Sequence, residues 1–165
     1  MEIAVRNSQR SIKVNPPEIK RILAAALMYL SRGRRIRGIN LSAGASFDPS
    51  DANVSVLLVG DNRMRALNLA YRGIDKTTDV LSFSQLEGIV VEQVSTDIGD
   101  IVINPVQAAR QAADRGIDVG LEMRHLLVHG LLHLIGYDHE KDRYNAMKMR
   151  KKEKELLNAL EKMGR

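Results

Sequence analysis

The chain has 165 residues, of which 44% are hydrophobic and 27% charged, a composition typical of a globular protein with a single domain over residues 1–165. It contains no cysteine, which excludes disulfides and thiolate metal sites and leaves imidazole and carboxylate groups as ligands for any zinc ion. The longest apolar run, residues 22–30, is far shorter than the ~20 residues that a membrane helix needs. We therefore expect a cytoplasmic protein without a membrane partner.

The net charge of +5 is distributed unevenly along the chain. Residues 1–40 contain nine Lys or Arg and two acidic residues, and residues 141–165 contain nine and four. The segment between them contains seven basic and fourteen acidic residues. Basic segments bind phosphate backbones, but they also form ordinary solvated helix faces. Charge alone leaves both interpretations open.

In the first half of the chain, the sequence predicts strands that alternate with helices. We expect a short strand at 3–5, a helix at 18–30 with prolines just before it, and a loop at 31–50 with a short strand near Ile39. The run VSVLLV at 54–59 predicts a buried strand. Asp61 is placed to cap a helix that continues through Tyr71 and ends at Gly73.

The second half adds two strands and three helices. Strands are predicted at 77–84 and 100–104, and the Asn104-Pro105 pair then opens a helix that runs to about Arg115. A helix from about Asp118 to Ile135 carries most of the histidines. A last helix, at about 141–163, has a predicted apolar stripe of Met147, Leu156, Leu157, Leu160 and Met163. The pattern predicts an α+β fold in which a small mixed β-sheet is covered by helices.

All four histidines of the chain lie between residues 125 and 139, three of them in the stretch HGLLHLIGYDH at 129–139. Residues four apart share a face of a helix, so His129 can form a chelating pair with either His125 or His133. His125 and His133 are separated by about 12 Å along the helix axis. Because a zinc–nitrogen bond is only ~2.0–2.1 Å long, one ion cannot bind both.

Gly136 decides between the two pairs. A glycine three residues after His133 is expected to end the helix and to let His139 return toward His129 and His133. We therefore predict one zinc ion held by these three histidines, with a fourth position open for water or substrate, as in a zincin-like catalytic site.

Two further residues near this predicted ligand set are candidates for supporting roles. His125 is left as a residue beside the ligands, in the core or at a partner contact. Asp138, the carboxylate nearest in sequence, is expected to orient a ligand imidazole through its second ring nitrogen.

The spacing matches the zinc-protease frame H-E-x-x-H-x-x-G-x-x-H except at one position. In that frame the glutamate is the general base of peptide hydrolysis, and here its place is taken by Gly130. The substitution makes ordinary protease chemistry a weaker hypothesis.

The stretch HGLLHLIGYDH resembles the signature of the YbeY-type endoribonucleases, a bacterial family implicated in maturing ribosomal RNA, especially the small-subunit 3′ end. LNLAYRGIDKTTDVLSF at 67–83 and GDIVIN at 99–104 resemble two further segments of that family. The resemblance implies zinc at His129, His133 and His139 and a catalytic role for Arg72. A guanidinium can hold a phosphate and stabilise the charge that develops during phosphodiester cleavage. The alternative for Arg72 is a solvated cation near a helix C-terminus.

Three hypotheses for the function follow. The first is a zinc-dependent, single-strand-specific endoribonuclease for ribosomal RNA processing and ribosome quality control, with the ribosome or ribosomal proteins as further partners. With only two Phe and four Tyr, such an enzyme would hold RNA through phosphate and metal rather than by base stacking. The second is a zinc peptidase or other hydrolase on the same frame. The third is a non-enzymatic ribosome-assembly factor whose zinc only stabilises the fold.

Overall fold

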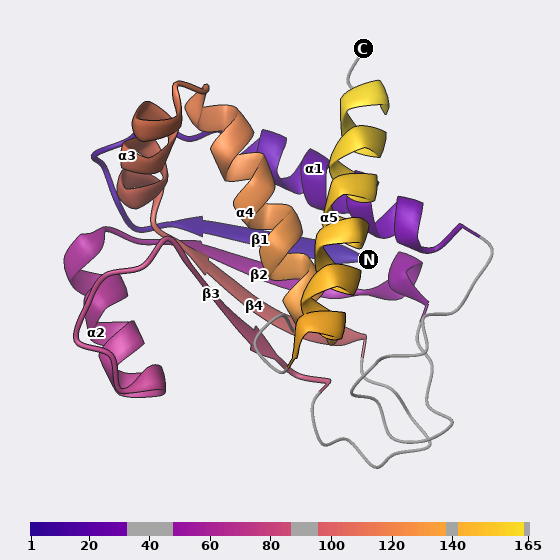
Figure 1. The fold of residues 1–165 in the computed structure, drawn as a ribbon, viewed down its shortest axis with the longest axis horizontal. Coiled ribbons are helices and arrows are strands. Elements are labelled where there is room, and N and C mark those ends of the chain that lie inside the picture. The colour runs from indigo at the N-terminus through magenta and orange to yellow at the C-terminus, as the bar shows by residue number, and fades with distance from the viewer. Residues whose placement is uncertain (33–47, 87–95, 138–141, 164–165) are drawn as a thin grey trace.

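The computed structural model describes residues 1–32, 48–86, 96–137 and 142–163, and Figure 1 shows the arrangement of their helices and strands. The loop predicted at 31–50, with its strand near Ile39, falls largely outside these ranges. None of the helices within the described ranges is both long and apolar enough to cross a membrane. The elements are, in chain order, β1 (Glu2–Asn7), α1 (Pro16–Leu30), the short 3-10 helix η1 (Pro49–Asp51), β2 (Asn53–Leu58), α2 (Asp61–Arg72), β3 (Val80–Ser84), β4 (Asp97–Ile103), α3 (Pro105–Arg115), α4 (Val119–Leu134) and α5 (Arg143–Met163).

The four strands form one mixed sheet in the order β1-β2-β4-β3. β1, β2 and β4 run parallel, and β3 pairs antiparallel with β4. β1 and β3 are therefore the two edges of the sheet. The α+β prediction, with a small mixed sheet covered by helices, is confirmed.

The two faces of the sheet are covered by different helices (Figure 1). Side chains alternate between the faces of a strand. In β4, Ile101 and Ile103 join the main core with residues of α1, α4 and α5, whereas Val102 packs with Met64 of α2. The histidine helix α4 thus lies on one face and α2 on the other. This division decides where the candidate site residues can meet.

Asn104 joins three elements at one end of the sheet. It is fully buried, and its side-chain oxygen accepts hydrogen bonds from the Val106 and Gln107 amides at the start of α3. Its amide nitrogen donates to Asp61 (2.7 Å) and to Thr77 (3.1 Å). The predicted helix start at Asn104-Pro105 is confirmed, and the same side chain fixes α2 and the segment before β3.

Replacing Asn104 with Ala is expected to lower the free energy of unfolding by about 2–3 kcal/mol. The change removes a helix cap and leaves buried polar groups unpaired. Urea denaturation monitored by circular dichroism measures the loss. Asn62→Ala, on the exposed side of α2, is the matched control and should change stability by no more than ~0.5 kcal/mol. Equal effects of the two substitutions would contradict the assigned role of Asn104.

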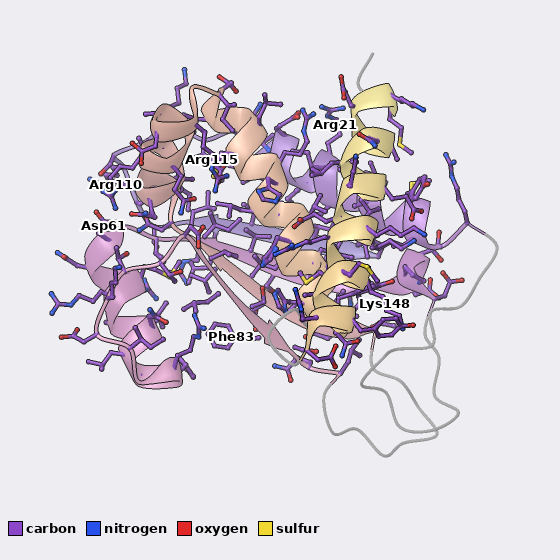
Figure 2. The ribbon with its side chains drawn as sticks, in the orientation of Figure 1. Arg21, Asp61, Phe83, Arg110, Arg115 and Lys148 are labelled. Atoms are coloured by element: carbon purple, nitrogen blue, oxygen red, sulfur yellow. The ribbon has the colours of Figure 1, made fainter. Side chains whose placement is uncertain are left out.

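Two local predictions around this junction are wrong. The N-cap of α2 is Gly60, not Asp61. The Asp61 carboxylate instead receives hydrogen bonds from Asn104 and from both terminal nitrogens of Arg110, at 3.0 and 2.7 Å (Figure 2). The strand predicted at 77–84 begins only at Val80, because the polar groups before it bond elsewhere. The Asp79 carbonyl, for example, accepts the backbone N–H of Asn104.

The apolar stripe of the last helix also differs from the prediction. Met147 and Met163 are 62% and 43% exposed, whereas Met149, which was not in the predicted stripe, is buried with Leu156 and Leu160. The helix begins at Arg143, close to the predicted start at about residue 141. The difference in the apolar stripe matters for the candidate site because it decides which α5 side chains face α4.

Candidate metal centre

His129 and His133 lie one turn apart on α4 and turn their ring edges toward each other. Their Nε2 atoms are 3.2 Å apart and their ring centroids 4.8 Å apart. Two zinc ligands with bonds of ~2.0–2.1 Å and a tetrahedral angle between them would place their nitrogens about 3.3–3.4 Å apart. The observed separation therefore fits two ligands of one metal ion, and both side chains are only partly buried, so the position can be reached from solvent.

The carboxylate of Glu153, on α5, fixes the orientation of the first of these rings. Its Oε1 atom lies 3.0 Å from Nδ1 of His129. Because a carboxylate can only accept, Nδ1 must carry the proton and Nε2 keeps its lone pair for a metal. A carboxylate behind a ligand imidazole is a recurrent arrangement in metal sites, where it holds the tautomer and raises the basicity of the ligand.

The same carboxylate oxygen also lies 3.2 Å from Nε2 of His125. Burial on its own would raise the pKa of Glu153, but the hydrogen bonds from His125 and His129 outweigh it and hold that pKa at about 2. The hydrogen bond to Glu153 in turn raises the pKa of His125. His125 therefore contacts the carboxylate that holds His129 and makes no pair with His133, in line with the distance argument.

The other predicted site residues on this segment, Asp138 and His139, lie outside the described residues. α4 ends at Leu134, and Gly136, the predicted helix terminator, adopts a left-handed conformation with φ of 94°. Within the described ranges no three His, Asp or Glu side chains gather to hold a metal ion. Zinc binding by three histidines thus remains a prediction. The structure describes two of the three predicted ligands.

Glu153 was missed because no local pattern marks it. It lies within a lysine-rich run, KMRKKEKE at 148–155, that resembles a solvated helix face. Only the packing of α5 against α4 brings it to the histidines. Asp138, predicted for the same supporting role from its nearness in sequence, lies outside the described residues, and its role stays a prediction.

Arg72 is the last residue of α2, on the opposite side of the sheet from α4. It is exposed, and Gly73 follows it in the left-handed conformation that ends the helix. Buried Asn68 donates to the Lys76 carbonyl (2.8 Å), which anchors the segment after the helix. The end of α2, where Tyr71 packs against Phe83, and the helix α4, where Gly130 faces Ser82, therefore lie on the two faces of the edge strand β3.

Gly130, at the place of the protease glutamate, faces the sheet. A Cβ atom added there would lie 2.8 Å from Cγ2 of Ile101 and 3.2 Å from Oγ of Ser82. The helix therefore needs a glycine to approach β3 and β4 this closely. A glutamate at 130 has no room on this backbone, so the general base of zinc peptidases has no equivalent at this position.

We expect Gly130→Ala to destabilise the protein, although alanine is the better helix former. Overpacking a tight core costs about 1–3 kcal/mol, against a gain in helix propensity of at most ~1 kcal/mol. Urea denaturation measures the net change. A variant as stable as the original protein, or more so, would show that α4 does not depend on this close contact.

Comparison with known proteins agrees with this architecture. The family model described as "Endoribonuclease YbeY" matches residues 4–161. Proteins of that name from Desulforamulus reducens and Thermodesulfovibrio yellowstonii are 40% and 35% identical to the chain, over 97% of the chain in both cases and 97% and 98% of their own lengths. A longer one, from Anaeromyxobacter sp., is 45% identical over 78% of the chain and 65% of its own length. The solution structure of TM1509 from Thermotoga maritima superposes with a TM-score of 0.57 at 25% identity, covering 96% of this chain and 88% of that one.

Proposed function

The chain belongs to the YbeY endoribonuclease family, and on this basis we propose that it is a zinc-dependent endoribonuclease specific for single-stranded RNA. Membership of the family makes it an enzyme that hydrolyses phosphodiester bonds of RNA. The proposal extends to ribosomal RNA as substrate, in small-subunit 3′ end maturation and ribosome quality control. It includes a cytoplasmic location and contact with the ribosome or ribosomal proteins.

The observation that carries the zinc part of the proposal is the His129–His133 pair, together with the hydrogen bond between Glu153 and His129. The two Nε2 atoms are at ligand separation, and the proton on Nδ1 of His129 is held by the carboxylate. His139 is the proposed third ligand. Zinc in this site would polarise the scissile phosphate or supply a hydroxide near neutral pH.

Arg72 is proposed to bind the phosphate at which the RNA is cleaved. An RNA strand that crosses the edge strand β3 would pass between the helix that carries Arg72 and the helix that carries the histidines. The guanidinium can donate two parallel hydrogen bonds to a phosphate and offset the negative charge that grows during cleavage.

Replacing Arg72 with Ala is expected to lower kcat/KM for a labelled single-stranded RNA by about 10²–10³-fold, the usual cost of one electrostatic donor in a transition state. Zinc content should not change. Arg63→Ala is the matched control, because Arg63 is an exposed arginine on the same helix. Undiminished cleavage by the Arg72 variant would remove that residue from the mechanism.

The two competing functions are separated by one substrate panel. A preparation of measured zinc content is given single-stranded RNA, duplex RNA and a peptide mixture. We expect cleavage of single-stranded RNA alone. Peptide cleavage without RNA cleavage would establish the peptidase, against which Gly130 argues. A folded zinc protein that cleaves none of the three would favour the assembly factor.

A further inference from the structure

The exposed side of α5 next to the candidate metal centre is strongly basic. Arg143, Arg150, Lys151 and Lys154 are all exposed. With 3.6 residues per turn, these four side chains project within about a third of the helix circumference, and they span about 16 Å along its axis. We call this surface, defined by these four residues, the α5 cationic face.

The same helix segment contains few acidic residues, and they make their bonds away from most of this face. Between residues 143 and 158 the only acids are Glu153 and Glu155. The Glu153 side chain is 16% exposed and bonds to His125 and His129. Glu155 bonds to Lys152 (2.9 Å) and to the Tyr29 hydroxyl (3.2 Å), and of the four cations only Lys151 acts on its charge. Within the described part of the chain, no ion pair is formed by the four cations.

The α5 cationic face also borders the candidate metal centre. Residues three apart on a helix are neighbours, so Arg150 lies beside Glu153, whose carboxylate contacts His129. Lys148 is not counted with the face, because its ammonium group lies over the Tyr144 ring, 4.2 Å from the ring centroid (Figure 2). Arg150 is therefore the member of the face that lies nearest to the candidate metal centre.

We propose that the α5 cationic face binds the phosphate backbone of single-stranded RNA and leads it to the histidine pair. The inference rests on the proposed function, because it names the surface that holds the same substrate outside the cleavage site. Four exposed cations along one side of the helix complement a chain that carries one negative charge per nucleotide, and the contact is independent of base sequence.

The test compares two triple variants with the same loss of charge. One is Arg150→Gln, Lys151→Gln and Lys154→Gln, and glutamine keeps the helix propensity of these positions. The control is Arg6→Gln, Lys13→Gln and Lys20→Gln, three exposed cations on β1, the segment after it and α1. Fluorescence anisotropy gives the affinity for a labelled single-stranded RNA at 50 to 200 mM salt, and a gel confirms that the RNA stays intact.

We expect the α5 triple variant to bind about tenfold more weakly at 50 mM salt. Each lost phosphate contact lowers the salt slope of log K by ~0.7, so its slope should be shallower by about 2. The control triple variant should keep the slope of the original protein. Equal effects in the two variants, or no effect in the α5 variant, would overturn the inference.

Two further outcomes keep the inference apart from its competitors. If the α5 variant loses binding to phosphatidylserine vesicles but keeps its RNA affinity, the face serves a membrane surface and the inference is wrong. If RNA binding follows the α5 face but purified zinc protein cleaves no RNA, the inference stands and the proposed function fails.

Discussion

Replacement of His133 with Ala is expected to remove the bound zinc and to lower cleavage of single-stranded RNA by about 10³-fold or more. A metal ion contributes several kcal/mol to transition-state stabilisation, and each 1.36 kcal/mol is a factor of ten in rate. His133 supplies one of the two nitrogens that lie 3.2 Å apart. Its loss leaves His129 without its partner on the helix.

His125→Ala is the matched control, because it removes the same side chain from the same helix eight residues earlier. His125 contacts Glu153 and not His133, so its variant should keep zinc and cleave within about tenfold of the original protein. Zinc content by mass spectrometry and the cleavage rate are measured on the same preparations. Equal zinc loss in the two variants, or cleavage by a zinc-free His133 variant, would contradict the assigned ligand set.

Replacement of Glu153 with Ala is the second change with a large expected effect. We expect zinc affinity to fall by about 10–100-fold, because Nδ1 of His129 loses the acceptor that holds its tautomer. Glu153→Gln keeps a carbonyl oxygen able to accept the same hydrogen bond and should show a smaller loss. Competition with a chromophoric chelator measures both affinities.

Glu155→Gln controls for a general effect of charge on α5. Glu155 lies on the same helix but bonds to Lys152 and Tyr29, away from the histidines. Its variant should bind zinc as the original protein does. The zinc-free stability of each variant is compared by urea denaturation. Zinc affinities that fall only in proportion to stability would show that Glu153 supports the fold and does not position His129.

Local signals explain why much of the fold could be predicted from the sequence. The caps of α3 and α4, Asn104 and Asp118, act on amides two or three residues away, and both helix starts were predicted correctly. The Asp61 cap failed because its carboxylate is engaged by groups 43 and 49 residues distant. Met147 and Met149 are methionines two positions apart, so residue type cannot tell which of them is buried. Only the packing of α5 decides this.

The same distinction holds at the candidate metal centre. The His129–His133 pair could be predicted because helical periodicity sets the separation of residues four apart. Glu153 could not, because its contact depends on how α5 docks against α4. Arg72 was singled out through the resemblance to the family and not through spacing, and the fold places it across β3 from the histidines. Its role therefore depends on where the RNA strand crosses the sheet edge.

The central claim is that zinc held by the α4 histidines is required for RNA cleavage. The most direct test removes the metal with a chelator and returns zinc in steps, while the cleavage rate of a labelled single-stranded RNA is followed. We expect activity to vanish in the metal-free protein and to return in proportion to bound zinc, reaching its maximum at one ion per chain. Undiminished cleavage by protein that is folded and free of metal would contradict the claim.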